Sequence, residues 1–420
     1  MNSKNSYFKD CCRLCSSKNL LKVVELTPTP PGNYFIKQED FDVEQECFPL
    51  ELFFCNDCSH IQLGHVVDPA YLFQNNYSYV SSTSKVFLKH LSDYADYISE
   101  YACLNKDSFV IDIGSNDGAC LSFFKQKGFK VLGVDPAKEI ADIANEKGIN
   151  TISDFFSSDL AIEIKEEYGS PNLITSHNAC AHINDLRGVI SGVEKLLSDD
   201  GLFVMEVGYF RDVFENLWFD TIYHEHLDFH TVTPLIGFFN SFNMEVVRIE
   251  RIEPQGGSIR VFVKKKKETN KVHDSVFKLV KQEEDLGLND PTKLNLFNER
   301  INKLKTDFKA IVANLKKQGH TIAAFGAPTK ATTLCYHFDI NKNDIEFIVD
   351  ENPLKQYLLS PGKKIPVFPL KTLYEKMPDF TIILAWNFAN SIMKNNLKYT
   401  ESGKSFILPM PVPKILKNNE

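Results

Sequence analysis

Tyr223, His224, Glu225 and His226 are four consecutive polar residues near the middle of the chain, within FDTIYHEHLDF (219–229). Side chains of these types can bind a metal, transfer a proton or stabilise a developing negative charge on oxygen. Histidine suits proton transfer at neutral pH because its unperturbed pKa is about 6.5. The stretch therefore predicts a reactive site whose chemistry depends on the motifs around it.

A zinc site is the alternative to acid–base chemistry at this stretch. His224 and His226 are two residues apart, whereas the H-E-x-x-H motif places its histidines one helical turn apart. On a strand both would share a face, but no third ligand stands at a matching spacing. Proton transfer is therefore favoured, and packing or turn roles for Tyr223, Glu225 and His226 remain open.

The backbone at this stretch is expected to be irregular. On a regular strand Tyr223 and Glu225 would share one face and His226 would lie on the other. Groups that act together must lie on the same side. We therefore expect a turn or an irregular loop here.

Two CxxC pairs near the N-terminus predict a metal site elsewhere. Cys12 and Cys15 lie in CRLC, and Cys55 and Cys58 lie in CNDC. Each pair can place two thiolates on one tetrahedral ion, so together they complete a closed four-cysteine zinc site. Cys11 could substitute in the first pair, and reduced surface turns or a redox pair are the alternatives. Four protein ligands leave no open position, so the zinc is expected to be structural.

A glycine turn between an apolar strand and a helix predicts a nucleotide site. VIDIGSNDGACL (110–121) contains Gly114 and Gly118, and Asp135 follows the next apolar run. Glycines allow close approach of the backbone to a ligand, and an acid at this distance can bind ribose hydroxyls. Asn116 occupies the centre of the turn, and the third glycine of the dinucleotide fingerprint and the lysine of a P-loop are absent. An adenosine without a pyrophosphate is favoured, with an NAD domain as the alternative.

The elements that must position these residues alternate between helix and strand. Strands bounded by helices predict a parallel, doubly wound α/β sheet. Two later strands, 244–252 and 258–264, lie close together across EPQGG and predict an antiparallel hairpin at an edge. The predicted strands are 108–114, 130–135, 172–176 and 201–207, and the predicted helices are 85–102, 119–128, 137–147 and 186–197.

The rest of the chain predicts further units around this core. A charged stretch with Leu and Phe at helical spacing is expected to form a connecting helix pair, and a second, smaller α/β unit follows it. The predicted units are a zinc-binding module at 1–75, a core at 76–265, a helical connector at 266–318 and a C-terminal α/β domain at 319–420.

Composition restricts the function classes. The chain has 420 residues and a formal net charge of −8, which argues against a nucleic-acid binder. No apolar run is long enough for a membrane span, and the N-terminus lacks the apolar segment of a secretory signal. We therefore expect a cytoplasmic protein, a monomer, without membrane or nucleic-acid partners. Lys264–Lys267 is interpreted as a solvated strand end.

The glycine loop resembles the first motif of class I S-adenosylmethionine-dependent methyltransferases. IDIGSNDG is similar to their cofactor loop, and Asp135 is similar to their ribose-binding acid. ITSHNACAHINDL (174–186) resembles the segment after their fourth strand. The resemblance implies that Asn178 and His182 face the cofactor or the substrate.

The order of motifs along nearly the whole chain is more specific. A four-cysteine module, a methyltransferase core, YHEHL, GGSIR and FGAPTKATTL follow one another. This order resembles the sugar C-methyltransferases that act on nucleotide-linked 4-keto-6-deoxy sugars. The resemblance implies a Rossmann-like methyltransferase core between a zinc module and a second Rossmann-like domain. It also implies methylation of C3 of a TDP-linked sugar, with S-adenosylmethionine and structural Zn²⁺ as cofactors.

The same resemblance implies roles for single residues. His226 would be the base, with Tyr223 and Glu225 beside it, and His224 occupies a variable position. A tyrosine from NNYSYVSSTS would complete the site; Tyr79 is favoured over Tyr77 as catalytic, and Tyr77 would contact the substrate. GAPTK, which ends in Lys330, and VDENP (349–353) would lie near the nucleotide sugar.

Chemistry explains why a carbon methyltransferase needs these residue types. A 4-keto group acidifies the neighbouring C3–H, so a histidine can remove the proton while a tyrosine hydroxyl stabilises the enolate oxygen. Glu225, or another acid, could orient the imidazole. The same residues could serve an O-methyltransferase, which remains the alternative. A zinc-bearing interaction protein with an inactive core and an RNA methyltransferase are less favoured.

Overall fold

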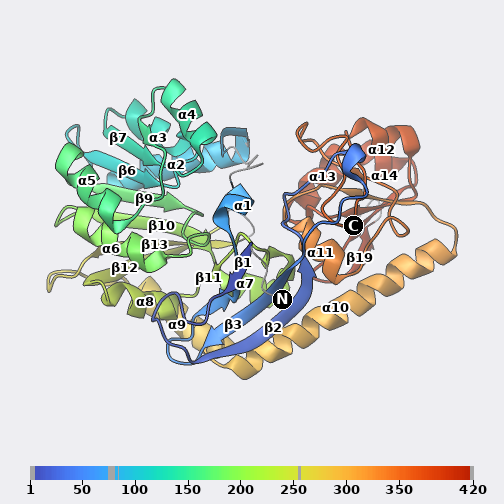
Figure 1. Cartoon of the computed structure of the whole chain (residues 1–420), viewed down its shortest axis with the longest axis horizontal. Coiled ribbons are helices and arrows are strands. Elements are labelled where there is room, and N and C mark those ends of the chain that lie inside the picture. The colour runs from blue at the N-terminus through green and yellow to red at the C-terminus, as the bar shows by residue number, and fades with distance from the viewer. Residues whose placement is uncertain (1–4, 74–80, 84, 254–256, 417–420) are drawn as a thin grey trace.

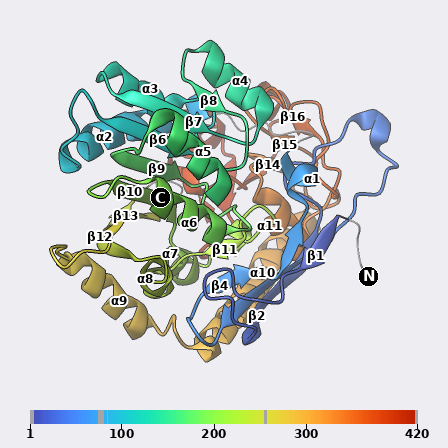
Figure 2. The same ribbon diagram turned by 60° about the vertical axis from the view of Figure 1, so that its left-hand side comes forward.

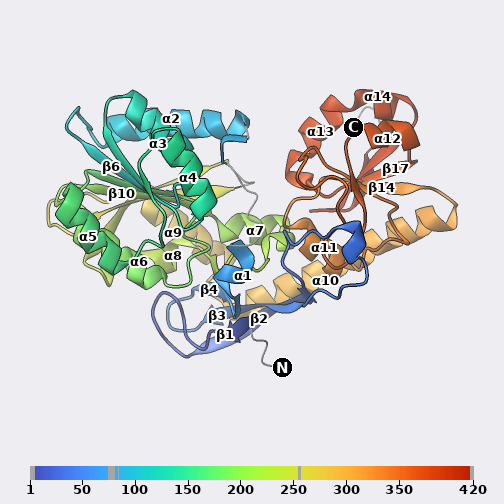
Figure 3. The same cartoon turned by 45° about the horizontal axis from the view of Figure 1, so that its top comes forward.

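The chain folds into two α/β units that are joined by an N-terminal sheet and a long helix (Figure 1). The computed structural model describes residues 5–73, 81–83, 85–253 and 257–416. In Figures 1 and 3, helix α10 (Pro291–Lys317) runs along the N-terminal strands from one unit to the other. Within the described part of the chain, no helix combines the length and apolar character that crossing a bilayer requires.

The first unit is built on a seven-stranded sheet of order β12-β13-β10-β9-β6-β7-β8. The strands β8, β7, β6, β9 and β10 are parallel and follow the 3-2-1-4-5 order of doubly wound folds. The edge hairpin β12–β13 is antiparallel, as predicted. The strands are β6 (Phe109–Ile113), β7 (Lys130–Val134), β8 (Thr151–Ile152), β9 (Leu173–His177), β10 (Leu202–Gly208), β12 (Met244–Ile252) and β13 (Ser258–Lys265).

Helices cover this sheet because its strands are apolar on both faces. All five residues of β6 are buried, which is typical of a parallel strand between two helical layers. Local capping fixes where some helices begin: Ser157 accepts from Leu160 N, and Asp185 accepts from Gly188 N. The helices of this unit are α2 (Lys85–Tyr101), α3 (Ala119–Gln126), α4 (Lys138–Glu146), α5 (Ser158–Tyr168), α6 (Leu186–Leu196), α7 (Phe210–Asn216), α8 (Val232–Asn240) and α9 (Asp274–Leu286).

The N-terminal strands form a separate four-stranded antiparallel sheet of order β11-β4-β3-β2. Its edge strand β11 (Asp228–Phe229) comes from the middle of the sequence and pairs with β4 (Ile61–Leu63), as Figure 2 shows. This pairing was not predicted. The other N-terminal elements are β1 (Ser6–Phe8), β2 (Leu20–Thr29), β3 (Phe48–Cys55), β5 (His65–Val67) and α1 (Pro69–Phe73).

The C-terminal unit is a second Rossmann-like domain. Its sheet order is β16-β15-β14-β17-β18-β19, and all pairs are parallel except the last. The first five strands repeat the 3-2-1-4-5 order. The elements are β14 (Ile322–Phe325), α11 (Ala331–His337), β15 (Ile348–Val349), β16 (Val367–Phe368), α12 (Lys371–Lys376), β17 (Phe380–Ile383), α13 (Ala389–Asn395), α14 (Leu397–Glu401), β18 (Ser405–Leu408) and β19 (Lys414–Leu416).

One apolar core joins the N-terminal sheet to the C-terminal domain. It includes Leu50 and Leu52 of β3, Phe297 and Phe308 of α10, and Leu334 of α11. A second core joins Cys12, Leu14 and Cys55 to the seven-stranded sheet and its helices. The N-terminal segment therefore packs against both α/β units, and residues from all three can meet in one site.

Candidate active site and zinc centre

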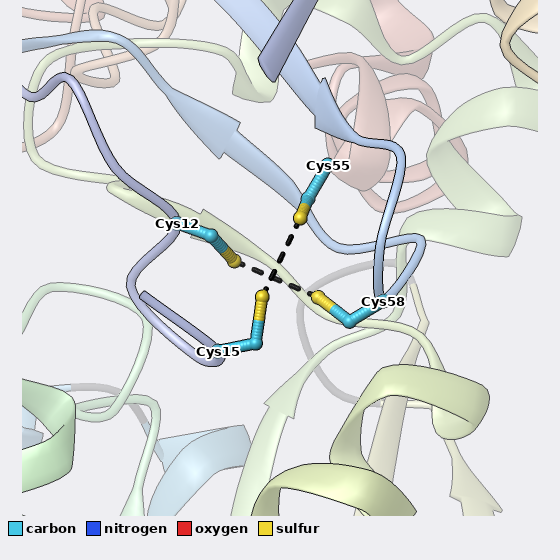
Figure 4. Close-up of side chains that lie close together, drawn as sticks. All are labelled: Cys12, Cys15, Cys55 and Cys58. Atoms are coloured by element: carbon cyan, nitrogen blue, oxygen red, sulfur yellow. Dashed lines mark hydrogen bonds between the residues drawn. The ribbon is translucent and has the colours of Figure 1, made fainter. Parts of the chain in front are cut away.

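The four predicted cysteines come together at two knuckles (Figure 4). One ligand atom from each of Cys12, Cys15, Cys55 and Cys58 lies within 4.8 Å of the others. The Sγ atoms are 3.6 Å apart for Cys12 and Cys58, and 3.5 Å apart for Cys15 and Cys55. In each knuckle a backbone N–H turns back to the first cysteine: Ser16 N donates to Cys12 O, and Ser59 N donates to Cys55 O.

This geometry fits a tetrahedral zinc ion. A Zn–S bond of about 2.3 Å implies sulfur–sulfur separations of about 3.8 Å. The observed separations are close to that value, and the four side chains converge from opposite sides (Figure 4). A site closed by four thiolates holds structure and has no position for substrate.

The glycine loop follows β6 at the point where the strand order reverses, between β6 and β9. Gly114 and Gly118 have φ angles of +74° and +75°. A Cβ at Gly114 would lie 2.5 Å from the Cβ of Ala179, so only glycine fits there. Asn116, at φ +49°, donates its backbone N–H to Asp135 Oδ2 at 2.8 Å. The loop is thereby fixed against the acid that follows β7.

Asp135 retains acceptor capacity for a ribose. Its Oδ1 accepts from Ala137 N at 2.9 Å, and its Oδ2 accepts from Asn116 N. Each carboxylate oxygen has a second lone pair, so two neighbouring hydroxyls can still be bound. Burial raises the pKa of Asp135, and the two backbone N–H groups oppose that rise. The loop and this carboxylate therefore fit the adenosine of S-adenosylmethionine.

Replacing Gly114 with alanine is expected to destabilise the loop and weaken cofactor binding. The new Cβ meets Ala179 and also strains the backbone, which should cost about 2 kcal/mol or more. Gly128→Ala is the control, because Gly128 also has a positive φ, +91°, but nothing lies within 4 Å of its added Cβ. Thermal unfolding and titration calorimetry measure the two effects. Equal losses of stability and cofactor affinity in both variants would contradict the contact with Ala179.

His226 lies in an irregular loop, as predicted, with its imidazole held in one tautomer. Its Nδ1–H donates to the carbonyl of Thr221 at 2.9 Å, so Nε2 carries the lone pair. The hydroxyl of Tyr223 donates to this Nε2, also at 2.9 Å. A turn in which His226 N donates to Tyr223 O puts the two side chains on the same side. The basic nitrogen and a hydroxyl donor are therefore adjacent.

The surroundings of His226 favour its neutral form. The pKa of His226 is lowered to about 3, mainly by desolvation and in part by His182 and Lys330, while the hydrogen bond to the Thr221 carbonyl opposes the shift. The His182 ring stands edge-on to the His226 ring, with centroids 4.9 Å apart. His182 belongs to the loop after β9 that also brings Ala179 against Gly114. His226 and the glycine loop are therefore connected by one short segment, 179–182.

Glu225 points to a different partner from the one expected. The carbonyl of Thr221, and not Glu225, accepts from the His226 imidazole, which corrects the expectation that this acid orients it. Glu225 Oε1 accepts from Asn33 Nδ2 at 3.0 Å, and Thr329 Oγ1 donates to Asn33 Oδ1 at 2.8 Å. Glu225 therefore connects the loop to the N-terminal segment and the C-terminal domain.

His224 is structural. It is 1% exposed, its Nε2 lies 3.2 Å from the carbonyl of Phe48, and its ring stands edge-on to the Phe48 ring. Burial lowers its pKa to about 4, so it is neutral at physiological pH. A buried histidine with this packing is unavailable to a substrate.

Glu225 predicts a pH-dependent stability. Burial raises its pKa to about 7 from 4.5, and Asn33 and Lys355 only partly offset that rise. Between these pH values the native state binds the proton more tightly than the unfolded chain, so the free energy of unfolding falls as pH rises. Glu225→Gln should remove that slope, which is worth at most about 3 kcal/mol. Chemical denaturation at pH 4.5 to 8 measures it, and parallel curves for both proteins would contradict the raised pKa.

The C-terminal domain carries a second glycine loop with matching geometry. Gly326 follows β14 at φ +89°, and its added Cβ would lie 2.5 Å from the Cβ of Ala385. Asp350 follows β15, and its carboxylate accepts from Ala327 N at 2.6 Å and from Asn352 N at 2.8 Å. In each sheet, therefore, a glycine follows the first strand of the 3-2-1-4-5 order and an aspartate follows the second.

Lys330 lies at the start of α11, beside this second loop. Its ammonium is 3.6 Å from the centroid of the Trp386 ring, and Trp386 Nε1 donates to Asp220 Oδ2 at 2.7 Å. Burial lowers the pKa of Lys330 to about 8, and Asp220 opposes that shift. Thr333 of α11 donates its hydroxyl to the carbonyl of Ile222 at 3.1 Å, so the second glycine loop and α11 lie on the same side of the site as the loop that carries His226.

The structure places most of the expected site residues either at the glycine loop after β6 or around His226. Asn178 is at φ +56° and donates its backbone N–H to Glu206 O, which positions the loop after β9. Tyr77 and Tyr79 lie outside the described residues; Ser81, which follows them, donates its backbone N–H to Asn116 Oδ1. The sequence analysis missed Thr221 and Asn33. Asn33 follows the turn-forming residues Pro30–Gly32, which indicate a loop but no contact with Glu225, and no local pattern indicates that the carbonyl of Thr221 binds an imidazole.

Three protein families match successive parts of the chain. Residues 12–73 match "Putative zinc binding domain", residues 87–249 match "Methyltransferase domain" and residues 253–411 match "C-methyltransferase C-terminal domain". The C-methyltransferase NovU of Streptomyces niveus is 33% identical over 407 residues, which cover 97% of each chain.

Solved structures resemble part of the chain at low identity. An S-adenosylmethionine-dependent methyltransferase of Clostridium acetobutylicum is 16% identical, covers 42% of this chain and 91% of its own, and has a TM-score of 0.35. A magnesium protoporphyrin IX methyltransferase of Synechocystis with bound S-adenosylmethionine is 13% identical, covers 42% and 80%, and has a TM-score of 0.32.

Proposed function

Because the chain belongs to the S-adenosylmethionine-dependent C-methyltransferases, we propose that it methylates C3 of a nucleotide-linked 4-keto-6-deoxy sugar, with His226 as the base. S-adenosylmethionine and structural zinc are its cofactors. When bound, S-adenosylmethionine supplies an electrophilic methyl group on a positively charged sulfur. The observation that carries the proposal is the neutral His226 imidazole, whose Nε2 lies 2.9 Å from the Tyr223 hydroxyl.

The cofactor-binding residues are those of the glycine loop and its neighbours. Gly114, Asn116 and Gly118 would hold the cofactor by close backbone approach, and Asp135 would accept from its ribose hydroxyls. Asn178 and His182, on the adjacent loop, would border the cofactor and the reacting carbon. The four cysteines, Cys12, Cys15, Cys55 and Cys58, would hold the zinc ion.

His226 would take the proton from C3. A carbon next to a ketone becomes nucleophilic only after this proton leaves, and the electron pair then spreads onto the ketone oxygen. Tyr223 can release Nε2 and donate its hydroxyl to that oxygen, and Tyr79 is proposed as a further catalytic donor. Glu225 would line the side of the site next to Asn33. Its pKa of about 7 would let it donate or accept a hydrogen bond at neutral pH.

The second glycine loop supports a nucleotide on the substrate. Asp350 and Gly326 repeat the contacts that Asp135 and Gly114 make in the core, so they would receive a second ribose. Lys330 would meet the phosphates, and Tyr77 would contact the sugar. A phosphate beside Lys330 would cancel part of the positive charge that lowers the pKa of His226, and so would strengthen the base when substrate is bound.

We also propose how the chain is divided and where it acts. It would comprise four parts, residues 1–75, 76–265, 266–318 and 319–420. It would act as a monomer in the cytoplasm on a TDP-linked substrate. The net charge of −8 supports the absence of a nucleic-acid partner.

Incubation with methyl-labelled S-adenosylmethionine and TDP-4-keto-6-deoxyglucose tests the proposal. The expected product carries the label on C3, which NMR identifies by a methyl carbon bonded to carbon. A label on oxygen would replace the proposal with sugar O-methylation. No transfer to this substrate or to its UDP- and CDP-linked analogues would reject a nucleotide-linked 4-keto sugar as substrate.

A further inference from the structure

The zinc knuckles are connected to the catalytic loop through the residues that follow His226. Leu227 N donates to Ala181 O of the methyltransferase core at 2.7 Å, and Leu227 O accepts from Leu63 N of β4 at 2.9 Å. Strand β11 then pairs with β4, so that Asp228 stands opposite Gln62. Strand β4 begins three residues after Cys58, the last cysteine of the second knuckle. The backbone next to the base is therefore held by the core on one side and by the zinc module on the other.

Arg13 connects the first knuckle to the same strands. It lies between Cys12 and Cys15 and is 2% exposed. Its Nη1 donates to Leu63 O at 2.8 Å and reaches Leu227 O at 3.4 Å. Its backbone N–H donates to the side chain of Gln62 at 2.8 Å. One buried guanidinium thus bonds to β4 and to Leu227, the residue between His226 and β11.

Asp228 provides the matching contact from the second knuckle. It is 3% exposed, and its Oδ1 accepts from His60 Nε2 at 2.7 Å. His60 follows Cys58 by two residues, and its carbonyl accepts from Cys55 N. Burial lowers the pKa of the Arg13 guanidinium and the Asp228 carboxylate partly offsets that fall, so the two charges attract each other inside the protein. A buried charge is retained at low cost only where such a partner is present.

We propose that Arg13 and Asp228 are positioning residues: they fix Leu227–Phe229, and through this strand the imidazole of His226, against the core loop that carries His182. The zinc ion would then serve catalysis at a distance, because it joins the two knuckles from which Arg13 and β4 emerge. The inference rests on the proposed base role of His226. It goes further in assigning the zinc module a mechanical part in proton removal.

Arg13→Met tests this inference in the full-length zinc-loaded protein. We expect the variant to retain one zinc per chain and wild-type affinity for S-adenosylmethionine. Solvent-deuterium exchange at C3 of the keto sugar without S-adenosylmethionine should slow by about 10- to 100-fold, because a small displacement of the base has an effect of this size. The imidazole NMR signals of His226, assigned by their loss in His226→Asn, should shift. Arg13→Lys, which restores the charge and one donor, should recover part of the exchange.

Arg187→Met is the matched control. Arg187 of α6 also donates to a carbonyl of the first knuckle, that of Leu14, and its guanidinium packs on the Phe242 ring. Within the described residues its side chain makes no hydrogen bond to β4 or β11, so its removal should leave exchange and the His226 signals unchanged.

Three outcomes test the positioning role of Arg13. Unchanged exchange and unchanged His226 signals in Arg13→Met would overturn the positioning role. If Arg13→Met loses zinc, Asp228→Asn is the variant that tests the inference. Asparagine still accepts from His60 but lacks the charge that attracts Arg13. Wild-type exchange and wild-type His226 signals in that variant would overturn the inference. If wild-type protein itself shows no exchange, the proposed chemistry fails, and the His226 signals alone decide the role of Arg13.

Discussion

Replacing His226 with asparagine is expected to lower kcat by about 10²- to 10⁴-fold, the usual contribution of a general base. The asparagine amide can take the place of Nδ1 and still donate to the Thr221 carbonyl, so the loop should keep its shape. What is lost is Nε2, the nitrogen that faces Tyr223 and would take the proton. Steady-state kinetics and calorimetry with S-adenosylmethionine should show lost turnover with unchanged cofactor affinity.

His320→Gln is the control for this substitution. His320 is partly exposed at the start of the C-terminal domain and pairs with Asp379, away from the glycine loops. It should leave kcat within about two-fold of wild type, as surface changes usually do. A fully active His226→Asn protein would remove His226 from the base role.

Replacing Cys55 with serine is expected to release zinc and destabilise the whole N-terminal segment. A zinc affinity weakened by about 100-fold lowers the stability of the saturated protein by about 2.7 kcal/mol. Cys55 is fully buried and packs with Leu14 in the core shared with the seven-stranded sheet, so the loss should spread beyond the knuckle. Metal analysis and thermal unfolding measure the zinc content and the stability.

Cys103→Ser is the matched control for the zinc prediction. Cys103 is an exposed cysteine after α2 that belongs to no knuckle. It should keep one zinc per chain and the wild-type unfolding temperature. Full zinc retention and unchanged stability in Cys55→Ser would contradict a closed four-thiolate site.

Local patterns in the sequence were sufficient to predict the α/β core. The run of β6, which is apolar except for Asp112, and the helical spacing of α2 require no distant contacts to be recognised. The hairpin β12–β13 followed from two apolar strands around a glycine turn. Strand β11 could not be predicted, because two residues carry no periodicity and their strand character depends on pairing with β4.

The parts of the candidate site that could be predicted are those whose geometry follows from the spacing of residues along the chain. The two CxxC pairs and the glycine loop are such cases. The partners of His226 and Glu225 were not predictable, because Thr221 acts through its backbone and Asn33 is 192 residues from Glu225. The turn that brings Tyr223 and His226 to one side was expected, because a regular strand would have placed them on opposite faces.

Proton exchange in the absence of the methyl donor tests His226-dependent carbanion chemistry most directly. Wild-type protein, TDP-4-keto-6-deoxyglucose and D₂O are incubated without S-adenosylmethionine, and the C3 proton is followed by NMR against an enzyme-free sample. We predict exchange at C3 in wild-type protein and exchange at the enzyme-free rate in His226→Asn. A wild-type protein that methylates the sugar but never exchanges C3–H, or an unchanged exchange rate in His226→Asn, would contradict proton removal by His226.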